Sequence, residues 1–344
     1  MKVTFFETND EDQNTIKNLF AATKAIKNAD VVFFKDKVDA SNVSAAKDTE
    51  VLGIFIHSKV TKEIINSLPE LKLIVTMSTG FDHIDVAYAK SKNIDVCNVP
   101  SYGSRTVAEF TFGLILGLSR KMFQAFRQVK DNHDFDITHF KGFNLQSKVL
   151  GVVGTGRIGL NVIKIAKGFD MNVLGFDAFP NEKMAKELGF KYTELDELLK
   201  NSDVITLHVP YNQNTHHLIN LSNINKIKKG AVLINTSRGE VVETEAVMTG
   251  IKQQILSGVG LDVLEGEKDL VEECSLITTP EGHHQACAAD FKVLLEDHLL
   301  ISLPEVAITP HIAFFTEEAK QEILRTTVEN IFGWQANQII NSVK

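Results

Sequence analysis

The sequence predicts an α/β protein made of two Rossmann-like, doubly wound parallel-sheet domains with a cleft between them. Three observations lead to this prediction. Short apolar runs alternate with helix-compatible segments along most of the 344 residues. A glycine-rich turn near the middle of the chain lies between an apolar run and a helical pattern. A chain of this length also suggests roughly two domains.

Composition and charge are typical of a soluble globular protein and argue against several other classes. Apolar residues make up 44% of the chain and charged residues 23%. The net charge of −8 argues against binding of nucleic acid through its backbone. No apolar run approaches the ~18 residues of a membrane span, and the acidic N-terminus does not fit a signal peptide. We therefore expect a cytoplasmic protein with no membrane or nucleic-acid partner.

The first hundred residues read as repeated strand–helix units. Apolar runs are expected to form strands at 3–6, 31–34, 51–56, 73–76 and 95–98, with helical segments such as 10–26 and 59–67 between them. The turn Ser78-Thr79-Gly80 follows the fourth run, where open parallel sheets place their ligands. The rest of this region is expected to be scaffold.

Residues 104–129 show a helical repeat of apolar side chains, including Val107, Leu114 and Met122. A helix this long and apolar is expected to be buried. The sequence leaves open whether it packs inside the chain or against a second subunit.

The segment 148–177 carries the pattern of a Rossmann dinucleotide-binding domain. An apolar run at 149–153 leads into a G-x-G-x-x-G turn, a helical pattern and a second apolar run at 172–176. Gly154 permits the tight turn, Gly156 lets the backbone approach a pyrophosphate, and Gly159 lets the helix and strand pack closely. The helix N-terminus offers free N–H groups and a positive dipole end to the phosphates.

Asp177 selects between the two nicotinamide cofactors. It follows the first glycine by 177 − 154 = 23 residues, near the ~20 that is typical of this fingerprint. A carboxylate at this position accepts hydrogen bonds from the ribose 2′-OH and repels a 2′-phosphate. We therefore expect NAD rather than NADP.

The chain continues with helices and strands in the order of a doubly wound fold. Helices are expected at 181–188, 195–201, 243–256 and 317–334, and strands at 204–207, 231–235, 258–262 and 306–308. Residues 264–304 read as an irregular insertion. The late helix at 317–334 is expected to return to the first domain.

Three of these strands end in unusual polar residues that can carry chemistry. They are Arg238, the segment from Asp262 to Glu267, and His311, and parallel strands place all three at one sheet edge. A guanidinium can grip the carboxylate of a 2-oxo acid with two hydrogen bonds. A protonated imidazole can donate a proton to the ketone oxygen as hydride reaches the carbon, and a nearby glutamate favours the protonated form. This set is what hydride transfer to a 2-oxo acid requires.

The motifs GTGRIG, HVP, INTSRGEVV, GLDVLEGE and TPHIAFFT occur in the order seen in the D-2-hydroxyacid dehydrogenase family. With STGFDHIDV and NVPSYG in the first domain, the sequence resembles this family over nearly its whole length. It is most similar to the bacterial NAD-dependent D-lactate dehydrogenases. The resemblance implies reduction of a 2-oxo acid, above all pyruvate, to the D-2-hydroxy acid.

The resemblance also implies roles for individual residues. Arg238 would orient the substrate, His311 would donate the proton, and Glu267 would be its acidic partner. The substrate would also contact Ser78, Thr79, Gly80 and Tyr102. Besides the three glycines, Asp177 and Arg238, the positions implied to contact NAD are Arg157, Ile158, Val209, Pro210, Thr215, Thr236, Ser237 and Asp262.

Domain limits and assembly follow from the same resemblance. Residues 1–102 and 312–344 would form the substrate-binding domain, and residues 103–311 the NAD-binding domain. A homodimer would form through the helical region 104–129.

Alternatives stay open at this stage. The chain could act on larger 2-oxo acids, as D-2-hydroxyisocaproate dehydrogenases do, or could be an NAD-sensing interaction protein without catalysis. Glu265 competes with Glu267 for the role of the acidic partner. We expect no metal site, since His133 and His139 lack ligand spacing and the order Cys274, His283, His284, Cys287 is not a usual zinc pattern.

Overall fold

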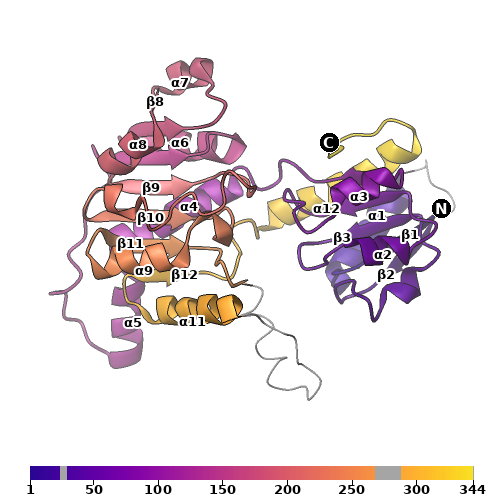
Figure 1. Cartoon of the computed structure of the whole chain (residues 1–344), viewed down its shortest axis with the longest axis horizontal. Coiled ribbons are helices and arrows are strands. Elements are labelled where there is room, and N and C mark those ends of the chain that lie inside the picture. The colour runs from indigo at the N-terminus through magenta and orange to yellow at the C-terminus, as the bar shows by residue number, and fades with distance from the viewer. Residues whose placement is uncertain (24–28, 268–287, 344) are drawn as a thin grey trace. The chain divides into compact units, whose positions relative to one another are not determined.

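The computed structural model describes residues 1–23, 29–267 and 288–343 (Figure 1). The described chain divides into two compact units. Unit 1 comprises Met1–Gly103 and Phe315–Lys344, and unit 2 comprises Ser104–Phe314. Each unit is a parallel sheet with helices on both faces, so the predicted fold class is confirmed.

Unit 1 has a five-stranded sheet in the order β2-β1-β3-β4-β5, with every neighbouring pair parallel. All five predicted strands are present. They are β1 (Lys2–Phe5), β2 (Asp30–Phe33), β3 (Val51–Ile54), β4 (Leu73–Thr76) and β5 (Asp95–Cys97).

Helices cover both faces of this sheet. On one face, the Phe20 ring of α1 (Asp10–Ala22) lies between Phe5 of β1 and Phe332 of α12 (Glu317–Gln335), with centroid distances of 6.5 and 5.3 Å. On the other face, α2 (Lys62–Asn66) and α3 (Val86–Ser91) share a buried cluster with alternate residues of the strands. A short 3₁₀ helix, η1 (Val43–Ala46), joins this cluster.

The C-terminal helix α12 is tied to the strand β5 by side-chain hydrogen bonds. Asn330 Nδ2 donates to the carbonyl of Asn98 at 2.8 Å, and Trp334 Nε1 donates to Asp95 Oδ2 at 2.9 Å. The end of the chain therefore completes unit 1, although more than 200 residues separate it from the rest of that unit.

Unit 2 has a seven-stranded parallel sheet in the order β12-β11-β10-β9-β6-β7-β8 (Figure 1). The order reverses beside β6, so the carboxyl ends of β6 and β9 form the switch point where such sheets bind ligands. The strands are β6 (Val149–Val153), β7 (Asn172–Phe176), β8 (Lys191–Tyr192), β9 (Val204–Leu207), β10 (Ala231–Asn235), β11 (Leu256–Leu261) and β12 (Val306–Ile308).

Consecutive residues of the central strands enter two different cores. In β10, Val232 and Ile234 belong to one buried cluster and Leu233 to the other. The first cluster includes α4 (Thr106–Ser119) and α6 (Arg157–Gly168), and the second includes α8 (Leu195–Asn201) and α9 (Thr244–Lys252). The remaining short elements are α7 (Glu182–Leu188), η2 (Ile224–Lys226) and η3 (Gly239–Val241).

The prediction of one long buried helix over 104–129 is wrong. The helix α4 ends at Ser119, and a separate helix α5 (Met122–Asn132) follows after Lys121, whose φ is +50°. The N–H of Phe143 donates to the Ser119 carbonyl at 2.9 Å and so takes the acceptor that a continuous helix would use. The second helix is not buried, and Phe126 is 64% exposed.

The reading of 264–304 as an irregular insertion is also wrong for part of the segment. Ala288–Ser302 form the helix α11, which contacts α9 and β12. Its apolar residues lie on several sides, since Leu300 is buried while Leu295 and Leu299 are exposed. The sequence therefore shows no one-sided stripe there. In the described part of the chain, no helix has the length and apolarity needed to cross a membrane.

Candidate active site

The glycine-rich turn after β6 is built for close backbone approach. Gly154 has φ +89°, and a Cβ there would lie 2.5 Å from the His208 carbonyl oxygen. A Cβ on Gly159 would lie 2.0 Å from the Gly154 carbonyl oxygen, so only glycine lets α6 start this close to the strand. At Gly156, by contrast, an added Cβ would meet nothing within 4 Å. Gly156 also precedes α6 without a side-chain cap. Open space beside uncapped helix N–H groups fits the pyrophosphate of NAD.

Asp177 follows β7 and faces the same turn. Its Oδ2 accepts hydrogen bonds from Thr155 N at 2.6 Å and from Thr155 Oγ1 at 2.9 Å, and its Oδ1 accepts from Phe179 N at 2.9 Å. The carboxylate therefore braces the glycine-rich turn, and its contact with the ribose hydroxyls of NAD stays a prediction.

Replacement of Asp177 should narrow the preference for NADH over NADPH. Asp177→Ala removes the acceptor for the ribose hydroxyl and the charge that repels a 2′-phosphate, so the ratio of the two kcat/KM values should fall about 10- to 100-fold. Asp177→Asn is the matched control for the turn, because its amide oxygen can still accept from Thr155. An unchanged ratio in both variants would mean that another residue sets the preference.

The residue that follows β9 is a partly buried histidine that sequence analysis did not single out. His208 donates its backbone N–H to the Val153 carbonyl at 2.7 Å, and its Nε2 lies 2.9 Å from Thr206 Oγ1. Its Nδ1 has no hydrogen-bond partner among the described residues. Burial lowers the pKa of His208 to about 3, so the imidazole beside the glycine-rich turn is neutral at physiological pH.

The lowered pKa of His208 predicts a loss of stability at acidic pH. The unfolded chain takes up a proton at His208 below pH 6.5, whereas the folded protein does so only near pH 3. The free energy of unfolding should therefore fall as the pH drops through 6.5, with a contribution from His208 of about 2 kcal/mol between pH 7 and pH 5. Urea denaturation of His208→Gln should show a smaller loss of unfolding free energy between pH 7 and pH 5 than the parent shows. The control His133→Gln, which changes an exposed histidine, should lose as much as the parent. Equal losses in parent and His208→Gln would contradict the expectation.

Other residues expected to contact the cofactor lie around the same sheet edge. Thr215 closes the turn after β9, because its Oγ1 donates to the Pro210 carbonyl at 2.6 Å and accepts from Asn212 N at 2.8 Å. Val209 packs against Gly154. Thr236 Oγ1 lies 3.2 Å from Thr111 Oγ1 of α4. Arg157 and Ile158 form the first turn of α6.

Arg238 lies in a turn that is held by hydrogen bonds to a buried asparagine. Asn235, the last residue of β10, accepts hydrogen bonds from Ser237 N and Ser237 Oγ at 3.0 and 2.7 Å and donates from Nδ2 to the Arg238 carbonyl at 2.7 Å. The guanidinium Nη1 donates to the Ser237 carbonyl at 2.8 Å. Sequence analysis missed Asn235. The signal for it is an asparagine, rather than another apolar residue, at the end of a fully buried strand.

The Arg238 turn lies directly against the loop that carries Glu267. A Cβ on Gly239 would lie 2.0 Å from the Leu264 carbonyl oxygen, so glycine is required for this contact. The strands β10 and β11 thus bring the substrate-orienting candidate and the acidic partner to neighbouring turns of the same edge.

His311 and Glu267 form a hydrogen-bonded pair. His311 Nδ1 lies 2.9 Å from Glu267 Oε1, and both side chains are partly exposed. This leaves Nε2 as the ring nitrogen available to a substrate. The Phe314 ring lies edge-on to the imidazole with centroids 6.3 Å apart. Of the two glutamates considered as the acidic partner of His311, Glu267 is the one that contacts the histidine, whereas Glu265 contacts other groups.

Asp262 holds the backbone of the His311 turn. His311 has φ +54°, a conformation that histidine rarely adopts. The Asp262 carboxylate accepts from Ile312 N at 3.0 Å, Ala313 N at 2.8 Å and Thr309 Oγ1 at 2.6 Å, and the Asp262 carbonyl accepts from His311 N at 2.9 Å. Burial raises the pKa of Asp262, and these hydrogen bonds oppose that shift. Asp262 therefore keeps His311 in its strained position.

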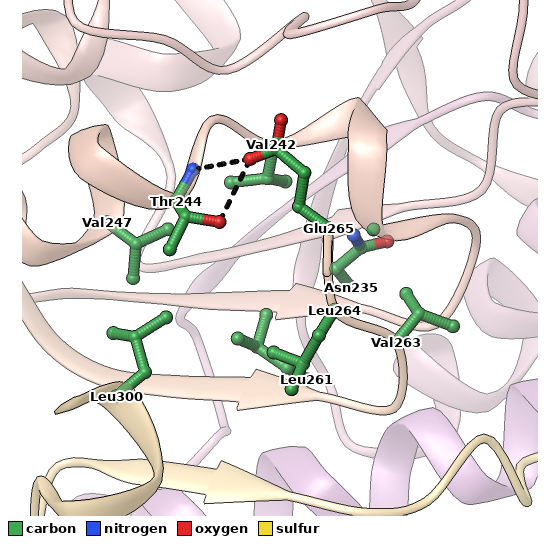
Figure 2. Close-up of a pocket in the computed structure, with 10 residues that line it drawn as sticks. Asn235, Val242, Thr244, Val247, Leu261, Val263, Leu264, Glu265 and Leu300 are labelled. Atoms are coloured by element: carbon green, nitrogen blue, oxygen red, sulfur yellow. Dashed lines mark hydrogen bonds between the residues drawn. The ribbon is translucent and has the colours of Figure 1, made fainter. Parts of the chain in front are cut away.

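Glu265 anchors the loop that carries Glu267. Its Oε2 accepts from Thr244 N at 3.2 Å and Thr244 Oγ1 at 3.0 Å, as Figure 2 shows, and its Oε1 lies 2.6 Å from His217 Nε2. A cavity of about 10 Å³ adjoins these groups and is lined mainly by apolar side chains. A volume near 10 Å³ holds about one water molecule, so this cavity is not a substrate pocket.

In unit 1, the turn Ser78-Thr79-Gly80 after β4 is fixed by its own side chains. Ser78 Oγ donates to the Gly80 carbonyl at 2.6 Å, and Thr79 Oγ1 donates to the Val99 carbonyl at 2.8 Å. Tyr102 is half-buried near the end of this unit. The substrate contacts expected of these residues stay predictions.

In the ranges that the structure describes, no group of three or more His, Cys, Asp or Glu side chains has an arrangement that could hold a metal ion. Cys274, His283, His284 and Cys287, the alternative zinc ligands, lie outside the described residues. Cys97 is buried and unpaired, and burial raises the pKa of its thiol to about 12.

Comparison with known proteins relates this chain to one family. Residues 112–313 match the family model described as "D-isomer specific 2-hydroxyacid dehydrogenase, NAD binding domain". A "2-hydroxyacid dehydrogenase homolog" from Haemophilus influenzae is 34% identical over 100% of this chain and 99% of its own length.

Solved structures agree with the family model. The D-lactate dehydrogenase of Aquifex aeolicus, solved with NAD and lactic acid, is 35% identical with a TM-score of 0.85, covering 98% of this chain and 96% of its own. A D-2-hydroxyisocaproate dehydrogenase is 26% identical with a TM-score of 0.82, covering 100% and 99%. The expectation of NAD as the cofactor is thereby confirmed.

Proposed function

This chain belongs to the D-isomer specific 2-hydroxyacid dehydrogenase family, and we propose that its reaction is the NAD-dependent reduction of pyruvate to D-lactate. The observation that carries the proposal is the His311–Glu267 pair, 2.9 Å apart, at the same sheet edge as Arg238 and the glycine-rich turn. The similarity to an enzyme solved with lactic acid favours the small substrate.

The residues divide the work of the reaction as follows. When bound, the reduced nicotinamide supplies the hydride that becomes the new C–H bond. His311 Nε2–H donates the proton to the ketone oxygen as the C=O bond becomes C–O, and the histidine is left neutral. Glu267 accepts from Nδ1–H and stabilises the imidazolium, which also carries a proton on Nε2, before transfer. After transfer Glu267 holds the neutral ring as the Nδ1–H tautomer.

Arg238 holds the other end of the substrate. The guanidinium can form two parallel hydrogen bonds with the carboxylate, which fixes the plane of the 2-oxo group for attack. The Asn235 brace limits the movement of the turn on which Arg238 stands. We propose that the backbone of Ser78, Thr79 and Gly80 and the hydroxyl of Tyr102 add further contacts to the substrate.

Comparison of three 2-oxo acids tests the substrate. The rate of NADH consumption is measured with pyruvate, 2-oxoisocaproate and phenylpyruvate at matched enzyme concentration. We expect the highest kcat/KM with pyruvate. A preference for either larger acid would keep the chemistry and transfer the function to the second candidate, a D-2-hydroxyisocaproate-type dehydrogenase, which the second solved structure favours. Binding of NADH without turnover of any oxo acid would favour the NAD-sensing alternative.

We also propose the domain roles and the assembly. Residues 1–102 with 312–344 would bind substrate, and residues 103–311 would bind NAD.

A homodimer through 104–129 is supported by the exposed apolar residues of α5, including Met122, Phe123 and Phe126. Sedimentation velocity should give the mass of two chains, and the mass of one chain would contradict this assembly. The cysteine spacing supports a reducing cytoplasm as the location.

A further inference from the structure

The loop between β11 and the acidic partner of His311 is held at two consecutive residues. Glu265 is anchored by Thr244 and His217, as described above. Gly266 is anchored by α11, because its N–H donates to Asp297 Oδ2 at 3.0 Å. Glu267 is the next residue, and its Oε1 reaches His311 Nδ1.

Asp297 is an unusual residue for its position. It lies in a helix with many apolar side chains and is 0% exposed. Its Oδ1 has no hydrogen-bond partner among the described residues, so the hydrogen bond to Gly266 is the contact that compensates its burial. An aspartate stands here although burial of an apolar side chain would cost less free energy.

Gly266 fits this contact because it has no side chain. A Cβ there would lie 2.8 Å from Asp297 Oδ2 and 3.1 Å from Val293 Cγ1. The glycine therefore lets the backbone N–H approach the helix closely. Any displacement of Gly266 would be transmitted to the adjacent Glu267, whose N–H donates to the Leu264 carbonyl at 3.3 Å and whose Oε1 lies 2.9 Å from His311 Nδ1.

We propose, on the basis of the function proposed above, that Asp297 is a positioning residue: it fixes Gly266 and thereby aims Glu267 at His311. Asp297 touches neither substrate nor cofactor in this role. The charged groups around it are Glu265 on the loop and Glu296 and His298 on its own helix. Burial raises the pKa of Asp297 to about 7, and the two glutamates add to that shift. Because a carboxyl group accepts through its carbonyl oxygen in either protonation state, the anchor persists across neutral pH.

Three variants of the full chain test this role. Asp297→Leu removes the acceptor while keeping bulk, Asp297→Asn keeps a carbonyl acceptor, and Glu296→Gln is the control on the same helix. In Asp297→Leu we expect kcat for pyruvate to fall about tenfold, with the Kd of NADH unchanged and the alkaline loss of activity moved to lower pH. Asp297→Asn should recover most of the lost kcat, and Glu296→Gln should match the parent.

A double-mutant cycle shows whether Asp297 acts through Glu267. In a Glu267→Gln background, Asp297→Leu should lower kcat less than about twofold, because the group that it positions has already been neutralised. A full tenfold loss in that background would overturn the role. So would a lower melting temperature in Asp297→Leu with kcat and the pH profile unchanged, or no recovery in Asp297→Asn.

Hydrogen exchange separates a failure of this inference from a failure of the proposed function. Amides of residues 264–267 should exchange about tenfold faster in Asp297→Leu than in the parent, whether or not pyruvate is reduced. Unchanged exchange would overturn the positioning role. If exchange is faster in Asp297→Leu but the parent protein reduces no oxo acid, the proposed catalytic function is refuted. The hydrogen bond from Gly266 to Asp297 would then still hold the loop, but it would have no effect on catalysis.

Discussion

His311→Ala should reduce kcat for pyruvate about 1,000-fold, since a positioned general acid contributes on the order of 100- to 10,000-fold. The hydride acceptor would still bind, but no group would be left to protonate the ketone oxygen as the charge develops on it. Stopped-flow or steady-state measurement of NADH oxidation gives the value directly. The Kd of NADH should stay close to that of the parent.

The backbone at this position calls for a second variant. Because His311 has φ +54°, alanine there also strains the turn held by Asp262. Asparagine adopts this conformation more readily and cannot act as an acid, so His311→Asn separates the two effects. Equal losses in both variants would assign the effect to the missing acid. Substantial activity in His311→Asn would refute the proton-donor role.

Arg238→Gln should lower kcat/KM for pyruvate by about 100- to 1,000-fold, because removing one partner of a charged pair costs about 2–5 kcal/mol. The loss should appear as a higher KM together with a lower kcat, since the guanidinium both captures the carboxylate and orients the ketone. Initial rates over a range of pyruvate concentrations separate the two terms.

Two further substitutions serve as controls for Arg238→Gln. Arg238→Lys keeps the charge but loses the planar fork, so its kcat/KM should lie between those of the parent and of Arg238→Gln. Arg105→Gln removes an exposed arginine that pairs with Glu109 at 2.6 Å, and it should behave like the parent. An unchanged kcat/KM in Arg238→Gln would remove Arg238 from the site.

Local patterns made most of the fold predictable. The strand, glycine turn and helix at 149–168 were placed correctly because their signals lie within a few residues of one another. The break between α4 and α5 was not predictable in this way. It depends on the Ser119 carbonyl meeting the N–H of Phe143, which is 24 residues further along the chain. The helix α11 was missed because its apolar residues do not form one stripe.

In the candidate site, too, some residues were predictable from local sequence motifs and others were not. Motif order brought attention to His311 and Glu267, and the structure places their side chains 2.9 Å apart. Asn235, which braces the Arg238 turn, and Asp297, which anchors Gly266, were not found from sequence. Asn235 and Asp297 act through hydrogen bonds to backbone groups, and the Asp297 bond joins residues 31 positions apart. No local pattern indicates the Asp297 contact, so a structure is needed to see it.

The identity of the product tests the central claim most directly. The purified protein is incubated with pyruvate and NADH, and the lactate formed is resolved by chiral chromatography as NADH is consumed. We expect one D-lactate for each NADH oxidised, with the rate of D-lactate formation about 1,000-fold lower in His311→Asn. L-lactate, a racemic product, or the absence of turnover with an intact NADH-binding site would contradict the proposed function.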